Sequence, residues 1–302
     1  MDIISSVLER VTLTSAVYFK SDFAAPWGME VPQGPFAQFH MVTGGLCILK
    51  VNKKMIQLRA GDIIVFPLGT KHWLADSPNS TRKNGQEVVQ SVFNGKSVFA
   101  GRHAATTLIC GHFEFDRTFD HAFIQELPNV IHITGIERKE LSWLDSVSNL
   151  IVKETESKKP GGEVLLRKLG EILFIHTLRA YIERNGSKKG FMAAIQDKKI
   201  GIALKTIHNN PENRMTLASL AQIAGISRTS FSNRFRTLIG DTPMGYITKW
   251  RIIEAKRLLK ESDRSVGEIA EKVGYKSEAA FNRVFKKQVA LTPLKFRKSV
   301  NV

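Results

Sequence analysis

The stretch from residue 217 to residue 293 contains the same pattern twice, and this duplication limits what the chain can fold into. Leu217 to Pro243 reads LASLAQIAGISRTSFSNRFRTLIGDTP, and Val266 to Pro293 reads VGEIAEKVGYKSEAAFNRVFKKQVALTP. The aromatic and Thr-Pro positions of the two copies are offset by 50 residues. Two copies this similar in length and pattern are expected to fold as one repeated helical unit.

Each copy predicts two short helices separated by a tight turn. In the first copy, Thr216 can cap one helix, Gly225 ends it, and Ser227 can cap the next. Gly274 and Ser277 take the same places in the second copy. The inward face of each second helix carries phenylalanines at helical spacing, namely Phe231, Phe235, Phe281 and Phe285. This pattern is typical of a helix-turn-helix, and a helical hairpin that only packs does not explain two copies with basic outer faces.

The positive charge of the chain is concentrated in its last third, which contains the repeated stretch. The 302 residues carry a formal charge of +16, of which residues 194–302, with 21 Lys/Arg and 9 Asp/Glu, hold +12. A domain that neutralises phosphates needs such an excess. A basic helix on a membrane surface needs an exposed apolar face. Here the apolar faces are expected to be buried by packing within the paired units. Nucleic acid is therefore the expected partner.

The inward phenylalanines leave defined positions of each second helix facing outward. In the second copy, Arg283 can bond guanine twice, Asn282 can bond adenine, and Glu278 can accept from cytosine. Asn233 is the corresponding adenine reader in the first copy, while Arg236, Arg251 and Lys286 are expected to hold phosphates. The candidate DNA contacts are Arg228, Thr229, Ser232, Asn233, Arg236, Arg251, Glu278, Asn282, Arg283 and Lys286.

Residues 18 to about 134 have a different character, with short β-rich runs broken by Gly and Pro. The predicted strands are 36–42, 46–51, 63–67, 106–115 and 130–133, an arrangement typical of a β-sandwich or barrel. Gly61 to His72 reads GDIIVFPLGTKH, which resembles the second sequence motif of cupin barrels. The first cupin motif is incomplete, since only His40 stands near its place. We therefore expect a cupin-like barrel and leave its metal chemistry open.

Side chains of this region could hold either a metal ion or an organic effector. Imidazole and thiolate are good ligands for zinc or a related divalent ion, and the candidate metal ligands are His40, His72, Cys110 and His112. Alternatively the histidines are hydrogen-bonded barrel residues or line an effector pocket, and Cys110 is a small core residue. The candidate effector-binding residues are Trp27, His40, His72 and His112, with Phe36 and Trp73 as further apolar wall.

The segments AKRLLKES (255–262), IAEKVGY (269–275), SEAAFNRVFKK (277–287) and LTPLKFR (291–297) carry a family signature. They resemble the AraC/XylS family of transcription regulators. The resemblance implies two helix-turn-helix units that read successive major-groove segments and are joined by a long helix, here Trp250 to Ser262. The N-terminal half is similar to the cupin-like sensory domain of such regulators, which binds an effector or holds a dimer together. Ala290 departs from the first unit, which has Gly240, and costs about 1 kcal/mol if the position is left-handed.

The remaining segments connect these parts. Residues 1–20 predict a short helix that leads into a strand, and residues 78–104 predict a mobile polar loop that could act as a lid. Residues 137–184 predict two helices with more apolar surface than packing on one barrel needs, so part of it is expected to pair with a second copy. The alternative is that both helices pack entirely against the barrel of their own chain. Residues 185–193, rich in Gly, Ser and Lys, predict a linker.

Together these expectations describe an α+β multidomain protein: a cupin-like sensory and dimerisation domain (1–184), a linker (185–193) and an all-α DNA-binding domain (194–302) with units at 216–243 and 265–293. The expected function is sequence-specific transcription regulation without enzymatic activity, controlled by a small effector or a metal in the barrel. A metal-dependent cupin enzyme fused to a DNA-binding domain, and a DNA-bending protein without sensing, are the alternatives. The expected partners are double-stranded DNA, a second copy, an effector and, for an activator, RNA polymerase. The N-terminus is not signal-like, no run is long enough to span a membrane and only two cysteines are present, so the cytoplasm is the expected location.

Overall fold

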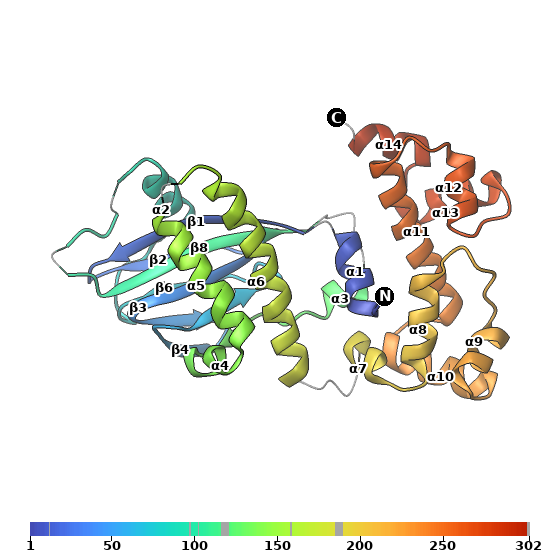
Figure 1. Cartoon of the computed structure of the whole chain (residues 1–302), viewed down its shortest axis with the longest axis horizontal. Helices are drawn as coiled ribbons and strands as arrows, with labels where there is room; N and C mark the ends of the chain where they lie inside the picture. The colour runs from blue at the N-terminus through green and yellow to red at the C-terminus, as the bar shows by residue number, and fades with distance from the viewer. Residues whose placement is uncertain are drawn as a thin grey trace. The chain divides into compact units, whose positions relative to one another are not determined.

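The computed structural model describes residues 1–11, 13–96, 98–101, 103–115, 121–157, 159–184 and 190–300, which fall into two compact units. The sheet unit comprises Leu13–Asp116 and Leu127–Asn185. The helical unit comprises Met1–Thr12, Arg117–Glu126 and Gly186–Val302. Figure 1 follows the chain through both units. Each unit is thus assembled from segments that are not continuous in sequence.

The sheet unit is built on one curled sheet, and the described residues contribute nine strands to it. The strands are β1 (Thr14–Phe23), β2 (Gly28–Val31), β3 (Ala37–Val51), β4 (Lys54–Arg59), β5 (Ile63–Phe66), β6 (His72–Ala75), β7 (Lys83–Asn84), β8 (Thr106–Glu114) and β9 (Ile131–Ile133). The main path runs β1-β8-β3-β6-β2-β7, while β4 pairs with β3, and β5 pairs with β3 and β9. The predicted cupin-like fold is confirmed.

Strand β3 is shared between the two halves of the sheet. Its first half pairs with β8 and β5, and its second half pairs with β4 and β6. The register shifts between Val42 and Gly44, and Gly45 has a φ of 70°. A Cβ on Gly45 would lie 2.0 Å from the carbonyl oxygen of Ala105, so only glycine fits this bend. The strands predicted at 36–42 and 46–51 are therefore one bent strand.

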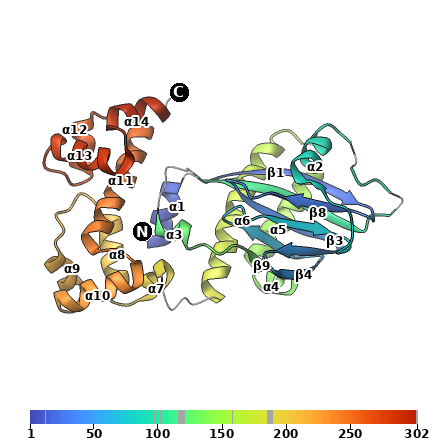
Figure 2. The ribbon, with the colours of Figure 1, turned by 180° about the vertical axis from the view of Figure 1, so that it is seen from behind.

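Four helices of the sheet unit accompany the strands: α2 (Gly85–Phe93), α4 (Gly135–Glu140), α5 (Ser142–Glu156) and α6 (Gly162–Arg184). Helices α5 and α6 lie side by side across one face of the sheet (Figures 1 and 2). Gly170 allows α6 to approach β1, because a Cβ there would lie 2.2 Å from Ser15 Oγ. Ser15 Oγ in turn donates to the carbonyl oxygen of Arg167 at 2.6 Å. Both helices lie where the sequence predicted them.

The prediction that residues 78–104 form a polar loop is wrong. Helix α2 occupies the middle of this segment, and Asn84 caps it by accepting from the Gln86 backbone NH. Val88 is fully buried in the core of the sheet unit. The sequence signal was hidden because α2 has only a few apolar residues between polar ones, and it is held by packing on β1 and β2.

The helical unit contains the remaining helices of the described chain: α1 (Ile3–Val11), α3 (Ala122–Gln125), α7 (Gly190–Gln196), α8 (Ile200–Asn209), α9 (Leu217–Ala224), α10 (Arg228–Ile239), α11 (Pro243–Glu261), α12 (Val266–Lys272), α13 (Glu278–Val289) and α14 (Pro293–Val300). Helix α7 occupies the end of the predicted linker, whose residues 185–189 lie outside the described residues. Among the described helices, none is long and apolar enough to cross a lipid bilayer.

The two predicted helix-turn-helix units are confirmed, as α9–α10 and α12–α13. Thr216, Ser227 and Ser277 each accept a hydrogen bond from a backbone NH of the helix they precede. Gly225 ends α9 in the left-handed conformation, with a φ of 63°. Ala290 takes the same conformation after α13, with a φ of 62°. The second unit therefore carries the strain of about 1 kcal/mol expected for alanine at this position.

Two segments that precede the linker pack into the helical unit. Arg10 of α1 donates to Glu254 Oε2 of α11 at 2.6 Å and lies 4.9 Å above the Trp250 ring. His121, which directly precedes α3, lies 2.9 Å from the Tyr246 hydroxyl of α11. Two segments within the predicted 1–184 domain, α1 and residues 121–126, thus complete the core of the helical unit.

Candidate DNA interface and effector pocket

Helix α10 exposes a polar face because its apolar face packs into the core of the helical unit. Phe231 and Phe235 are fully buried, as predicted. The predicted DNA contacts on this helix are exposed or, for Ser232, half-buried: Arg228, Thr229, Ser232, Asn233 and Arg236. A helix held by its caps and two aromatic anchors offers these side chains to a groove without rearrangement.

Helix α13 repeats the arrangement. Phe281 and Phe285 are fully buried, and Glu278, Arg283 and Lys286 are exposed. Asn282 is half-buried and its Nδ2 lies 3.5 Å from Glu278 Oε1, a long contact between successive turns. The exposed set combines a guanidinium and an ammonium, which bond phosphates and base edges, with a carboxylate, which can accept a hydrogen bond from a base edge.

Arg251, which is predicted to contact phosphate, bonds backbone carbonyl groups in this structure, and its contact with DNA stays a prediction. Its Nε donates to the carbonyl oxygen of Pro211 at 2.8 Å, and its guanidinium also donates to that of Asn213 at 2.8 Å. The guanidinium lies 5.8 Å from the Tyr275 ring. Burial lowers the pKa of Arg251, but the guanidinium stays charged because it loses its proton only far above neutral pH. Arg251 therefore holds the 211–213 turn against α11.

A further residue of α10 has a positioning role that sequence reasoning missed. Arg234 Nε donates to Asp197 Oδ2 at 2.7 Å, and Asp197 Oδ1 accepts from the backbone NH groups of Lys199 and Ile200. Asp197 thereby links the start of α8 to α10. The local signal was only an acidic residue a few positions before α8, which is typical of a cap.

Helix α11 connects the two helix-turn-helix units, and a buried aromatic cluster surrounds its first half. Trp250 is fully buried, stacked on His208 of α8 at 3.8 Å between ring centroids. The Phe123 backbone NH donates to His121 Nδ1, so His121 Nε2 carries the proton and donates to Tyr246 Oη at 2.9 Å. Tyr246 then donates to His208 Nε2 at 2.6 Å. Burial lowers the pKa of His121 to about 3 and that of His208 well below its usual value, so both rings are neutral.

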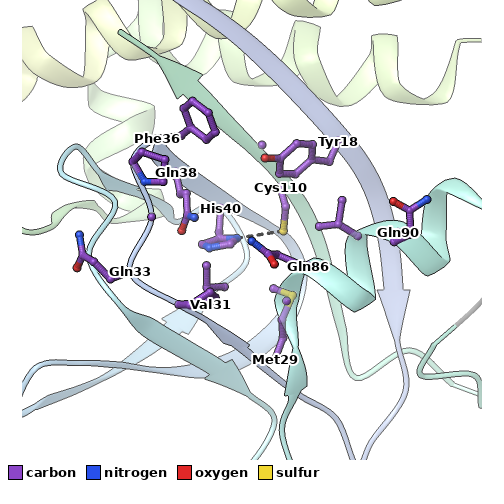
Figure 3. A pocket seen from close by; sticks show the side chains of 16 residues that line it. Tyr18, Met29, Val31, Gln33, Phe36, Gln38, His40, Gln86, Gln90 and Cys110 are labelled. Atoms are coloured by element: carbon purple, nitrogen blue, oxygen red, sulfur yellow. Dashed lines mark hydrogen bonds between the residues drawn. The ribbon is translucent and has the colours of Figure 1, made fainter. Parts of the chain in front are cut away.

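The sheet unit contains a pocket of about 380 Å³ between β1, β2, β3, β8 and α2 (Figure 3). Figure 3 shows His40 and Cys110 at its floor, with Tyr18 and Phe36 on one side and the glutamines of α2 on another. The volume lies within the range typical of small-molecule sites. The sheet therefore offers a concave, mixed polar and apolar cavity.

At the floor of the pocket, His72, His40 and Cys110 form a chain of hydrogen bonds. The Thr70 carbonyl oxygen at one end of this chain fixes which atom donates in each bond. His72 Nδ1 lies 2.7 Å from the Thr70 carbonyl oxygen, an acceptor only, so this nitrogen carries the proton. His72 Nε2 must then accept from His40 Nε2 at 2.8 Å. His40 Nδ1 in turn accepts from the Cys110 thiol at 3.0 Å. Burial lowers the pKa of His72 to about 4 and raises that of Cys110, so the chain is uncharged.

The four predicted metal ligands do not converge on one point. His40 uses its two ring nitrogens, on opposite sides of the ring, to contact Cys110 and His72, so a single ion cannot bond all three residues. His112 Nε2 instead bonds Glu114 Oε1 at 2.8 Å. Within the described residues, no group of three or more His, Cys, Asp or Glu side chains is placed to hold a metal ion. The predicted tetrad therefore does not fit a cupin metal.

The predicted effector-binding residues lie in different surroundings in the structure. His40 lines the pocket, and His72 lies behind it. His112 contacts the rings of Tyr18 and Phe36, with centroids 5.0 and 5.3 Å away. Trp27 belongs instead to the hydrophobic core, where its Nε1 donates to Thr106 Oγ1 at 3.2 Å. Sequence reasoning missed Gln38 and α2, although Gln38 stands two residues before His40 and shares its face of the strand.

Two helix-turn-helix units on one connecting helix, in a chain that also folds a cupin-like sheet, define a DNA-binding regulator with a cupin domain. The family model described as Cupin matches residues 2–183, and the model described as Helix-turn-helix domain matches residues 220–299. The chain belongs to the AraC/XylS family of transcriptional regulators with an N-terminal cupin domain.

Relatives extend over the whole chain. An uncharacterized HTH-type transcriptional regulator of Haemophilus influenzae is 28% identical, with 100% of both chains covered. The regulator AlkR of Acinetobacter baylyi is 27% identical over 98% of this chain and 99% of its own. The DNA-binding domain of AdpA, solved in complex with a target DNA, is 31% identical over 34% of this chain and 92% of that chain, with a TM-score of 0.33. The full-length relatives are named as regulators, and this chain is likewise a DNA-binding transcriptional regulator.

Proposed function

We propose that this regulator reads an operator with α10 and α13 and that a small molecule in the pocket of the sheet unit controls the reading. The observation that carries the first part is the matched pair of capped, anchored helices whose outward faces expose Arg228, Asn233, Arg283 and Lys286. Residues 194–302 also hold +12 of the formal charge of +16. Together these features support binding to two successive major-groove segments.

Two substitutions on α13 separate base reading from phosphate binding. Arg283→Ala is expected to weaken operator binding roughly tenfold or more and to relax the preference at one base pair. Lys286→Ala is expected to weaken binding to all sequences alike and to reduce the salt slope by about one. Fluorescence anisotropy with operator and scrambled duplexes at several salt concentrations measures both.

The matched control is Lys54→Ala, which removes the same charge from an exposed position of the sheet unit. It should bind both duplexes like the parent. If Arg283→Ala and Lys286→Ala behave like Lys54→Ala, α13 is not a recognition helix and the proposal for it is abandoned.

Effector control is supported by the pocket and by the continuity of its strand with the helical unit. Strand β8 contributes Cys110 and Gly111 to the pocket lining, and the chain that leaves β8 reaches His121 in the core around α11. A ligand that favours one arrangement of β8 would shift the population of DNA-binding states only through its differential affinity for them. A regulatory rather than an enzymatic role is in keeping with the floor of the pocket, where every ring nitrogen of His40 and His72 is engaged.

A second copy of the chain is the proposed partner of α6. Leu165 and Ile172, seven residues apart on one face of this helix, are 47% and 40% exposed, and Leu150 of α5 is 51% exposed. The double variant Leu165→Glu/Ile172→Glu is expected to be monomeric where the parent is dimeric, because the charges would be buried without partners. Sedimentation velocity measures this, with Lys153→Glu as a control at an exposed site of α5. A dimer that survives the double variant would place the interface elsewhere.

A further inference from the structure

The lining of the pocket in the sheet unit carries no charge. The described residues that line it include no Asp, Glu, Lys or Arg, and the titratable ones among them are Tyr18, His40 and Cys110. Burial raises the pKa of Tyr18 to about 12, raises that of Cys110 and lowers that of His40 well below its usual value, so all three are neutral. An ion in this pocket would lose its hydration without meeting an opposite charge, which is strongly unfavourable. The lining therefore favours an uncharged occupant.

The polar side chains at the floor of the pocket already bond one another. His40 donates from Nε2 to His72 and accepts at Nδ1 from Cys110. This second bond uses the single hydrogen of the Cys110 thiol. Gln38 also lines the pocket, but its Oε1 is enclosed by the protein and does not offer an acceptor to the cavity. A ligand with several hydroxyl groups would leave them without partners at this depth, and each such group is costly to bury.

The side walls of the pocket are mainly apolar. Met29 and Val31, two residues apart on β2, share one face of that strand and line the pocket. Val89 of α2 and Phe36, which directly precedes β3, add further apolar surface. The cavity of about 380 Å³ lies at the small end of the range of about 300–1,000 Å³ typical of ligand pockets. Its walls therefore suit the apolar body of a small molecule.

The polar groups that remain are at the open edge of the pocket. Gln86 and Gln90, four residues apart on α2, lie on the same face of the helix and are both exposed. Figure 3 shows both side chains on the α2 side of the cavity. The amide of Gln33 is already engaged, since it donates to the Leu68 carbonyl oxygen and accepts from the Lys71 backbone NH. The α2 glutamines can therefore bond one uncharged polar group of a ligand near solvent.

We propose that the pocket binds a small, uncharged and mainly apolar molecule, whose apolar body lies against the His40–Cys110 floor and the β2 wall and whose one polar group lies near Gln86 and Gln90. Carboxylates, ammonium ions, phosphates and sugars are outside this class, because each would bring charges or hydroxyl groups that the lining does not pair. The assignment rests on the proposed effector function of the same pocket and names the chemistry of its ligand.

Four probes of similar size test the assignment on the full-length chain. Acetophenone is uncharged and apolar apart from one carbonyl group, benzoate is an anion, benzylamine is a cation at neutral pH, and xylose is an uncharged polyol. Saturation-transfer NMR titrations give the affinity of each probe. Acetophenone is expected to bind at least about tenfold more tightly than the other three. Equal or tighter binding of benzoate, benzylamine or xylose, or no binding of acetophenone at millimolar concentration, overturns the proposal.

Two valines of α2 place the bound probe. Val89→Glu adds a carboxylate to the pocket wall, so it is expected to weaken acetophenone binding at least about tenfold and to make benzylamine the tighter ligand. Val92→Glu is the matched control, because Val92 is a half-buried residue of the same helix that packs on the same core outside the pocket lining. It should keep the order of affinities of the parent. The same shift in both variants would place acetophenone outside the pocket and contradict the assignment.

An exposed position keeps the test readable if Val89→Glu does not fold. Gln86→Glu adds a carboxylate at the open edge of the pocket without burying it. The affinity of benzylamine relative to acetophenone is expected to rise about threefold, the size typical of a solvent-exposed ion pair. An unchanged ratio in the folded Gln86→Glu protein counts against the pocket as the binding site.

Ligand class and effector control fail in different ways. Operator binding is measured by fluorescence anisotropy with and without saturating acetophenone, in the parent, Val89→Glu and Val92→Glu chains. A change in operator affinity that Val89→Glu abolishes and Val92→Glu retains supports both the ligand class and effector control. Selective acetophenone binding that leaves operator affinity unchanged supports the ligand class and overturns control by the pocket. A pocket that does not prefer acetophenone overturns the ligand class, while the Arg283→Ala measurement decides DNA recognition independently.

Discussion

Replacing Trp250 by alanine is expected to lower the unfolding free energy of the helical unit by about 3–5 kcal/mol, a large part of the stability of a domain. Trp250 is fully buried and meets His208 of α8, Arg10 of α1 and His121 before α3. Its loss leaves a cavity where four segments join. Operator binding should fall with stability, since both recognition helices depend on α11. Urea unfolding followed by circular dichroism measures the effect.

Two other tryptophan variants show whether burial causes the loss. Trp250→Phe keeps a ring and removes an indole NH that has no partner among the described residues, so it should cost clearly less than Trp250→Ala. Trp143→Ala removes a half-buried ring that stacks on His176 in the sheet unit, and operator binding should survive it. A Trp250→Ala protein within 1 kcal/mol of the parent would mean that this cluster does not hold the unit together.

Gly111→Ala is expected to destabilise the sheet unit by about 3 kcal/mol. An added Cβ would lie 2.3 Å from the Ala16 carbonyl oxygen and 2.4 Å from a ring carbon of Phe39. Neither neighbour can move easily, because Ala16 belongs to the β1–β8 ladder and Phe39 is fully buried and stacked on Phe113. The overlap would push β8 away from β1 or β3 and deform the pocket. Thermal unfolding followed by circular dichroism measures the effect.

Gly161→Ala separates steric overlap from backbone strain in the same unit. Gly161 has a φ of 86°, but an added Cβ meets nothing within 4 Å. Its replacement should cost only about 1 kcal/mol, the penalty of a left-handed alanine. Phe39→Leu, added to Gly111→Ala, should recover part of the stability because it removes one of the two clashes. Equal losses in Gly111→Ala and Gly161→Ala would argue that the strands adapt freely.

Sequence patterns were sufficient where the structure is local. Caps, helix-ending glycines and buried phenylalanines all lie within a few residues of one another, and they located α9, α10, α12 and α13. The Gly61–His72 motif located β5 and the turn before His72. These elements were predictable because each is specified by short-range chemistry.

The rest depends on partners that are distant in sequence. The carbonyl partners of Arg251 lie about 40 residues before it, so its local sequence did not indicate these hydrogen bonds. The spacing of Cys110 and His112 on one strand predicts that they share a face, but only the side-chain geometry shows that the ring of His40 separates Cys110 from His72. No sequence feature singled out Gln38, because the residues that decide whether its amide is hydrogen-bonded are distant in sequence.

The packing of α1 against α11 has a consequence for how the chain folds during its synthesis. Arg10 and Glu254 are separated by 244 residues, so during synthesis α1 meets its ion-pair partner only after α11 has been made. The sheet unit can close in the meantime, with Ile3, Val7 and Val11 still facing water. Closing so long a loop is slow compared with forming the local helices. Completion of the DNA-binding core is therefore the late step, and a nascent or truncated chain without α11 carries an uncovered apolar helix that chaperones would recognise.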